Sequence, residues 1–111
     1  MDGPETRLAT YGTLAPGRVN AHQLDGLDGT WSQGTVRGTL YAEGWGSDMG
    51  YPGITLDPAG DPVQVHLFIS QDLPEHWARL DAFEGPGYTR TAVTVETKSS
   101  PVEAFIYALA K

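Results

Sequence analysis

The sequence of 111 residues contains no cysteine, few basic residues and no long apolar run. Without cysteine there is no disulfide, thiolate metal site, iron–sulfur cluster or cysteine nucleophile. Seven lysine and arginine residues stand against fourteen aspartate and glutamate residues, which gives a formal net charge of −7. This balance argues against nucleic acid and anionic membranes as partners. The longest apolar run, 104–110, is far too short to cross a bilayer.

A targeting signal is also missing from the start of the sequence. Residues 1–30 contain no apolar run of the length that a signal peptide needs. With the lack of cysteine, this favours a cytoplasmic protein. Hydrophobic residues make up 40% of the chain, as in ordinary globular proteins, and the length fits one domain over residues 1–111.

Glycine and proline, by contrast, are abundant. Fourteen glycines and eight prolines predict many tight turns between short elements. Apolar alternation predicts strands over 7–11, 34–43, 54–56, 63–69, 88–97 and 102–109, with a Gly/Asp-rich loop at 25–32. A glycine inside the second strand, Gly38, is expected to mark a bend or bulge. About six strands, mostly joined by hairpins, and one main helix predict an α+β fold with a closed or nearly closed barrel.

The main helix is predicted over Asp72–Phe83. Asp72 is its expected N-cap, and Pro74 fits the first turn. One apolar face is expected to contain Leu73, Trp77, Leu80 and Phe83. Gly85-Pro86-Gly87 then ends the helix, because glycine tolerates positive φ and proline cannot continue the hydrogen-bond ladder.

Glu84, at the end of this helix, is the candidate catalytic residue. The negative end of the helix dipole and the apolar neighbour Phe83 both disfavour its charge, so both raise its pKa. A carboxyl of raised pKa suits general acid–base chemistry near neutral pH. A solvated glutamate at a helix end is the alternative, and on local sequence alone it is the commoner case.

Further candidates lie on either side of Glu84. The glycine-rich loop 12–17 leaves backbone N–H groups that can bind an anion or oxyanion, although most such loops are only turns. Tyr88 and Arg90 share one face of the strand after Glu84. Tyr88 would orient Glu84, and Arg90 would bind a substrate carboxylate. The alternative is that both residues pack at the barrel rim. Asp81 shares a helix face with Glu84, and structural hydrogen bonds are expected from it rather than a carboxylate dyad.

Metal and serine chemistry are not predicted. His22, His66 and His76 show no ligand spacing, so we expect no metal site. The serines lack a nucleophile-elbow context, which argues against a Ser-His-Asp hydrolase. Trp45, in the glycine-rich loop 44–50, is a candidate cover for a pocket.

Two motifs carry a resemblance to a known family. Tyr11-Gly12-Thr13-Leu14, and Leu80 to Gly85 followed by Tyr88 and Arg90, resemble the gamma-glutamylcyclotransferase-like superfamily. The resemblance covers nearly the whole chain, and the small gamma-glutamylamine cyclotransferase-like members are the most similar. It implies a small mixed β-barrel with helices packed outside. The matching positions imply Glu84 as acid–base catalyst and a substrate-binding loop of Tyr11, Gly12, Thr13 and Leu14.

The resemblance also implies a reaction. The α-amino group of a γ-glutamyl unit attacks its own γ-carbonyl, releasing 5-oxoproline and an amine or amino acid. This implies a small γ-glutamyl or related amide as partner and requires no metal or other cofactor, while the leaving group and oligomeric state stay open. Three alternatives remain: a metabolite-binding barrel without turnover, an acid–base catalyst on another amide, and an interaction domain that uses the barrel edge.

Overall fold

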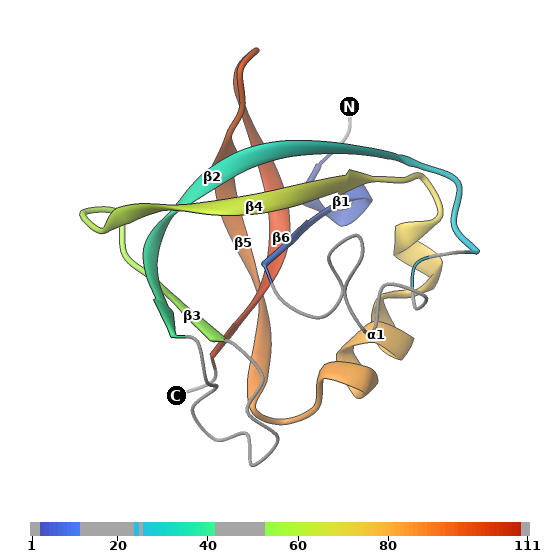
Figure 1. Cartoon of the computed structure of the whole chain (residues 1–111). Helices are drawn as coiled ribbons and strands as arrows, with labels where there is room; N and C mark the ends of the chain where they lie inside the picture. The colour runs from blue at the N-terminus through green and yellow to red at the C-terminus, as the bar shows by residue number, and fades with distance from the viewer. Residues whose placement is uncertain (1–2, 12–23, 25, 42–52, 110–111) are drawn as a thin grey trace.

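A computed structural model describes residues 3–11, 24, 26–41 and 53–109. One sheet of six strands dominates it (Figure 1). The strands are β1 (Arg7–Thr10), β2 (Thr30–Tyr41), β3 (Gly53–Leu56), β4 (Asp61–Ile69), β5 (Tyr88–Glu96) and β6 (Pro101–Leu109). Two 3-10 helices, η1 (Pro4–Thr6) and η3 (Leu73–Glu75), and one α-helix, α1 (Trp77–Glu84), complete the described elements.

The sheet closes into a barrel. Its strand order is β3-β2-β4-β1-β6-β5, and a further pairing of Thr35 on β2 with Glu96 on β5 joins the two ends. Five strands therefore form the closed barrel, and β3 lies outside it on β2. All pairs are antiparallel except β1 with β6, so the barrel is mixed. The prediction of a mixed, mostly antiparallel barrel with about six strands is confirmed.

Two glycines allow backbones to approach one another along β2. A Cβ on Gly34 would lie 2.6 Å from Val95 Cγ1 and 2.7 Å from the Glu96 carbonyl oxygen, at the point where β2 meets β5. A Cβ on Gly38 would lie 2.1 Å from the Thr55 carbonyl oxygen. Gly38 pairs with both Leu56 on β3 and Asp61 on β4, so this glycine marks the place where β2 exchanges neighbours.

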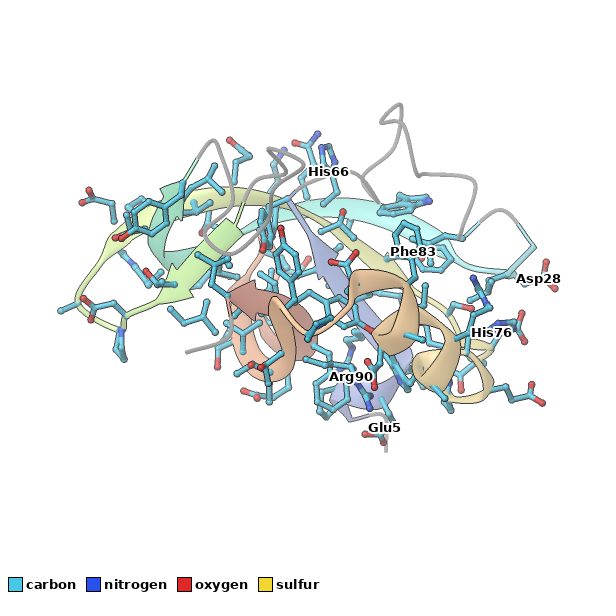
Figure 2. All side chains as sticks on the ribbon, turned by 90° about the horizontal axis from the view of Figure 1, so that it is seen from below. Glu5, Asp28, His66, His76, Phe83 and Arg90 are labelled. Atoms are coloured by element: carbon cyan, nitrogen blue, oxygen red, sulfur yellow. The ribbon has the colours of Figure 1, made fainter. Side chains whose placement is uncertain are left out.

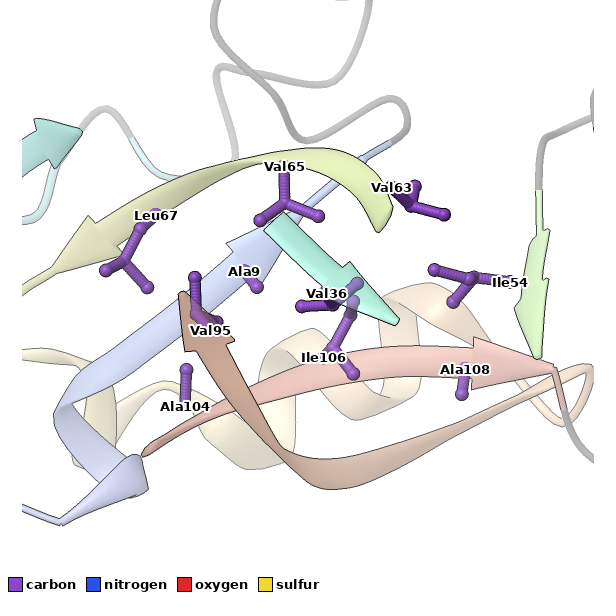
Figure 3. Packing of buried hydrophobic residues seen from close by; sticks show 10 residues of the cluster. All are labelled: Ala9, Val36, Ile54, Val63, Val65, Leu67, Val95, Ala104, Ile106 and Ala108. Atoms are coloured by element: carbon purple, nitrogen blue, oxygen red, sulfur yellow. The ribbon is translucent and has the colours of Figure 1, made fainter. Parts of the chain in front are cut away.

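The barrel interior is filled by small and branched apolar side chains (Figure 3). They come from every strand: Ala9, Val36, Ile54, Val63, Val65, Leu67, Val95, Ala104, Ile106 and Ala108. The alternation expected for 63–69 is confirmed, because Val63, Val65 and Leu67 point inward. An interior packed in this way is a core and leaves the chemistry to the outside of the barrel.

A second apolar layer lies between the outer face of the sheet and the helices. It contains Leu8, Leu24, Leu27, Phe68, Leu73, Trp77, Leu80 and Tyr107. Figure 1 shows α1 beside the barrel, so the prediction of one main helix outside the sheet is confirmed. Trp77 ties this layer to η1, since its Nε1–H donates a 2.8 Å hydrogen bond to the Glu5 carbonyl.

The helix itself differs from its prediction. The stretch 72–83 is split into η3 and α1, with His76 between them at φ −112° and ψ −4°. Asp72 makes no cap hydrogen bond, because its Oδ2 accepts a 2.9 Å hydrogen bond from the Asp28 N–H instead. Phe83 is 38% exposed, and the predicted four-residue apolar face is wrong at this position. Because the helix is interrupted at His76, the residue spacing of one continuous helix, which was expected to bury Phe83, does not hold.

The start of β2 also differs from the prediction. Residues 30–32 pair with β4 at Ile69, Phe68 and Leu67, so they belong to a strand and not to the predicted loop. Trp31 stacks on Phe68 with ring centroids 4.7 Å apart. This long-range pairing leaves no periodic signal in the Gly/Asp-rich local sequence.

Candidate active site

Glu84 is the last residue of α1. Gly85 follows at φ 81°, and its N–H donates a 3.0 Å hydrogen bond to the Asp81 carbonyl, which ends the helix. The predicted position of Glu84 at a helix C-terminus is therefore confirmed. Its side chain is partly buried, and burial raises the pKa of the Glu84 carboxyl to about 7. A carboxyl of this kind exchanges protons readily at neutral pH.

Two phenols interact electrostatically with Glu84, Tyr11 just after β1 and Tyr107 on β6. Burial raises the pKa of Tyr11, with smaller contributions from Tyr88 and Glu84 that outweigh the opposing backbone hydrogen bond with Ile54. Burial also raises the pKa of Tyr107, and its hydrogen bond to Asp81 adds to the rise. Both phenols therefore keep their protons at neutral pH and act as donors. The Tyr11 hydroxyl donates a 2.5 Å hydrogen bond to the Tyr107 carbonyl, which fixes the end of β1 against β6.

One turn before Glu84, Asp81 joins α1 to two strands. Its Oδ1 accepts a 2.7 Å hydrogen bond from the Tyr107 hydroxyl and lies 3.0 Å from Arg90 Nε. The expectation of structural hydrogen bonding by Asp81 is confirmed. No described residue accepts a well-aligned hydrogen bond from Arg90 Nε, so we treat the contact with Asp81 as an ion pair.

Arg90 also lies between two aromatic rings. Its guanidinium carbon is 4.7 Å from the ring centroids of both Trp77 and Phe105, which are themselves in an edge-to-face contact. Figure 2 places Arg90 on the side of α1 where Glu5 lies, and Phe83 on the opposite side. Cation–π attraction and the charge of Asp81 thus hold the Arg90 side chain in one place.

A cavity of about 320 Å³ opens beside this cluster. Of the described residues, Asp81, Tyr88, Thr89, Arg90 and Tyr107 line it. The structure thus brings two predicted substrate-binding residues, Tyr88 and Arg90, to one cavity next to the helix that carries Glu84. Their shared strand face is confirmed, and their contact with a substrate stays a prediction.

Other predicted features lie outside the described residues. These are Gly12, Thr13 and Leu14 of the binding loop and Trp45. Within the described ranges, no group of three or more His, Asp or Glu side chains is placed to hold a metal ion. Among the same residues, no helix has both the length and the apolar character needed to cross a bilayer.

Sequence reasoning did not single out Tyr107 as a site residue. The signal was available in the strand alternation, because Phe105 and Tyr107 lie on the face opposite Ile106. Two aromatic residues on the outward face of a barrel strand indicate that something packs against them. The hydrogen bond to Asp81, however, depends on the long-range docking of α1 and could not be derived from β6 alone.

Comparison with known proteins identifies a family and a fold. The profile of the family described as "Gamma-glutamyl cyclotransferase, AIG2-like" matches residues 8–111. YkqA from Bacillus subtilis is 27% identical, with a TM-score of 0.73, over 94% of this chain and 35% of its own. This chain therefore spans about a third of the length of YkqA. No match was found among curated protein sequences.

Two further solved structures have the same fold at lower identity. An AIG2-like protein from Mus musculus is 21% identical with a TM-score of 0.73, covering 95% of this chain and 77% of its own. The protein PH0828 from Pyrococcus horikoshii is 24% identical with a TM-score of 0.68, covering 96% and 79%. Because the family profile covers most of the sequence, the chain belongs to the AIG2-like gamma-glutamyl cyclotransferase family.

Proposed function

We propose that the protein is a cyclotransferase that releases 5-oxoproline from a γ-glutamyl amide, with Glu84 as general acid–base catalyst. The observation that carries this proposal is the partly buried Glu84 carboxyl at the end of α1, with its pKa raised to about 7. Membership of the cyclotransferase family supplies the reaction class. A cytoplasmic location and a small amide as partner belong to the same proposal.

The reaction needs a proton to be moved twice. The α-ammonium of the γ-glutamyl unit must first lose a proton, and the Glu84 carboxylate accepts it. The neutral amine then attacks the γ-carbonyl and forms the new C–N bond of the five-membered ring. As the bond from the γ-carbon to the leaving nitrogen breaks, the Glu84 carboxyl returns the proton to that nitrogen. The ring nitrogen still has two hydrogens after the attack, and it loses one of them to water. The products are then 5-oxoproline, a neutral amine and one proton, and Glu84 is again a carboxylate.

The remaining predicted residues have supporting roles in this proposal. Backbone N–H groups of Tyr11, Gly12, Thr13 and Leu14 would hold the substrate carboxylate or the developing oxyanion. Tyr88 and Arg90 would contact the substrate from the cavity beside α1. The side chain of Tyr11 holds β6 through the Tyr107 carbonyl, so the proposal assigns binding to its backbone.

The test is release of 5-oxoproline from γ-glutamyl amines, γ-glutamyl amino acids and glutathione by the wild type and Glu84→Gln. Glutamine keeps the size of the side chain but cannot carry the proton, so we expect kcat to fall by roughly 10²- to 10⁴-fold. Glu96→Gln is the matched control, because Glu96 is an exposed glutamate on β5. We expect this control to retain wild-type turnover.

Each part of the proposal can fail separately. Turnover that survives in a folded Glu84→Gln protein would remove Glu84 as the catalyst while leaving the reaction in place. No release from any substrate by the wild type would remove the reaction itself. Ligand-induced thermal shifts would then test the metabolite-binding alternative.

A further inference from the structure

The last turn of α1 is held by contacts to two strands of the barrel. A single oxygen, Asp81 Oδ1, is the meeting point for the Tyr107 hydroxyl of β6 and Arg90 Nε of β5. Asp81 stands three positions before Glu84, so the two residues share one turn of the helix. A movement of Asp81 relative to the strands therefore moves Glu84 as well.

The helix is too short to hold this position by itself. It has eight residues, whereas an isolated helix in water needs about 12 to 15 even with favourable residues. Its first residue, Trp77, is anchored through Nε1–H to the Glu5 carbonyl. Arg90 packs on that same indole and on Phe105 of β6. The start and the last turn of α1 are thus tied to the barrel by side chains that meet at Arg90.

Stability alone does not account for these polar contacts. The side chains of Arg90 and Asp81 are 27% and 43% exposed, and an ion pair with that exposure contributes little to folding. Glu84 belongs to the same helix turn as Asp81, so the place of that turn sets where the Glu84 carboxyl lies.

We propose that Asp81, Arg90 and Tyr107 form a positioning unit, which keeps the Glu84 carboxyl withdrawn from solvent and within electrostatic range of Tyr11 and Tyr107. The unit acts through Glu84 and does not touch the reacting atoms. The Tyr107 residue contributes twice, since its hydroxyl holds Asp81 and its carbonyl holds the Tyr11 hydroxyl. The inference rests on the proposed function only for its kinetic consequence.

The first test needs no turnover. The Glu84 carboxyl is titrated by carbon NMR in the wild type and in Tyr107→Phe, which loses the hydroxyl but keeps the ring and the backbone carbonyl. In the wild type we expect a midpoint near 7. If the helix turn moves outward, water reaches Glu84, and the midpoint should fall by about one unit or more, a tenfold loss of proton affinity. Tyr11 and Tyr107, which interact electrostatically with Glu84, stay neutral throughout this pH range, because the pKa of each is raised.

The second test uses the reaction. We expect Tyr107→Phe to lower kcat about tenfold with KM within twofold of the wild type, because binding groups stay in place while the catalyst moves. Asp81→Asn keeps an oxygen for the Tyr107 hydroxyl but loses the charge that attracts Arg90, so its effects should be in the same direction. The double variant should be less than additive, because both changes loosen the hold of the barrel strands on Asp81.

The matched control is Thr94→Val on the same β5–β6 hairpin. The Thr94 hydroxyl donates a 2.8 Å hydrogen bond to Glu103 Oε1, an exposed contact four residues along β5 from Arg90. Its removal deletes one side-chain hydrogen bond, as Tyr107→Phe does, and we expect neither the Glu84 midpoint nor kcat to change. Near-UV circular dichroism checks that each variant is folded, and Asp81→Asn carries the test if Tyr107→Phe does not fold.

Three results would overturn the inference or reassign its parts. A folded Tyr107→Phe or Asp81→Asn protein with an unchanged midpoint and unchanged kcat contradicts the positioning unit. A rise in KM with unchanged kcat in Arg90→Lys leaves Arg90 with its proposed substrate contact alone and removes it from the unit. An inactive wild type contradicts the proposed function, while the carboxyl titration still decides the positioning.

Discussion

The inside of the barrel and the layer between its outer face and α1 are built from different kinds of residue. Inside are aliphatic side chains such as Val36, Val95 and Ile106, all essentially inaccessible to water. Outside, the aromatic ring of Trp77 packs together with the charged Arg90 at the edge of a cavity. The apolar interior holds the strands in register, and the outer layer contains the groups that can take part in chemistry.

This difference separates stability from function. Each side chain of the interior contributes by burial and packing, which depend on volume and shape. The outer layer instead carries partly exposed hydrogen bonds and an ion pair, which contribute little to folding but fix directions in space. Changes inside should therefore lower the free energy of unfolding, whereas changes outside should act on turnover and proton affinity.

The largest effect on stability is expected from Ile106→Ala. Ile106 is 0% exposed at the centre of the interior, so its truncation removes buried apolar area and leaves a cavity. We expect a loss of about 3–4 kcal/mol in the free energy of unfolding, measured by urea denaturation. The kcat of the protein that stays folded should match the wild type. A fall in kcat comparable to that of Tyr107→Phe would contradict the view that the interior acts on stability and the outer layer on turnover.

A smaller loss is expected from Gly34→Ala, where β2 meets β5. The new Cβ would lie 2.7 Å from the Glu96 carbonyl oxygen. Because this oxygen belongs to the backbone of a paired strand, the clash can be relieved only if the strand moves. We expect about 1–3 kcal/mol of destabilisation by thermal or urea unfolding. Gly26→Ala is the control, because nothing lies within 4 Å of its Cβ position. Equal losses at the two glycines would contradict the steric explanation.

Glu84→Gln should stabilise the protein, but only at higher pH. The folded state raises the pKa of Glu84 from 4.5 to about 7, so between these values it binds more protons than the unfolded chain. Wild-type stability is therefore reduced as pH rises from about 4.5 to about 7, and glutamine removes that loss. Allowing for partial exposure, we expect a gain of about 1–2 kcal/mol at pH 8 relative to pH 4. Urea denaturation of the wild type and the variant at both pH values measures this gain. If the difference in free energy of unfolding between the two proteins is the same at pH 4 and pH 8, burial does not raise the pKa of Glu84.

The smallest effect is expected at Leu40 on β2. Leu40 is 46% exposed, where β2 has left the barrel to pair with β3. We expect Leu40→Gln to change the free energy of unfolding by less than about 0.5 kcal/mol, with unchanged kcat. A loss comparable to that of Ile106→Ala would indicate that the Leu40 side chain itself contributes to the core.

Local signals in the sequence predicted most of the strands and the position of Glu84. Alternation was clear where one strand face is buried, as at Val63, Val65 and Leu67, and the Gly85 to Gly87 stretch marked the helix end. The failures fall where long-range contacts decide the structure. Asp72 was expected to cap a helix, yet it binds the Asp28 N–H from a distant loop.

The site could be predicted in part for the same reason. Glu84 and the shared face of Tyr88 and Arg90 follow from local order along the chain. The meeting of Tyr107 with Asp81 depends on how a helix docks on a closed barrel, and no local pattern contains that information. The use of Arg90 as the partner of Asp81 was missed because a guanidinium can serve either an internal carboxylate or one from a ligand.

The parallel pairing of β1 with β6 has a consequence for how the protein folds. The Tyr11 hydroxyl and the Tyr107 carbonyl, which meet beside Glu84, stand 96 positions apart in the sequence. Contacts between residues so far apart in the sequence raise the contact order and slow folding. A long loop must close before they form, and its closure costs conformational entropy. The two sides of the site therefore come together late, when β6 joins β1. A partly folded chain, even one with most of its hairpins formed, would lack the contact between Tyr11 and Tyr107 and thus the arrangement proposed for the site.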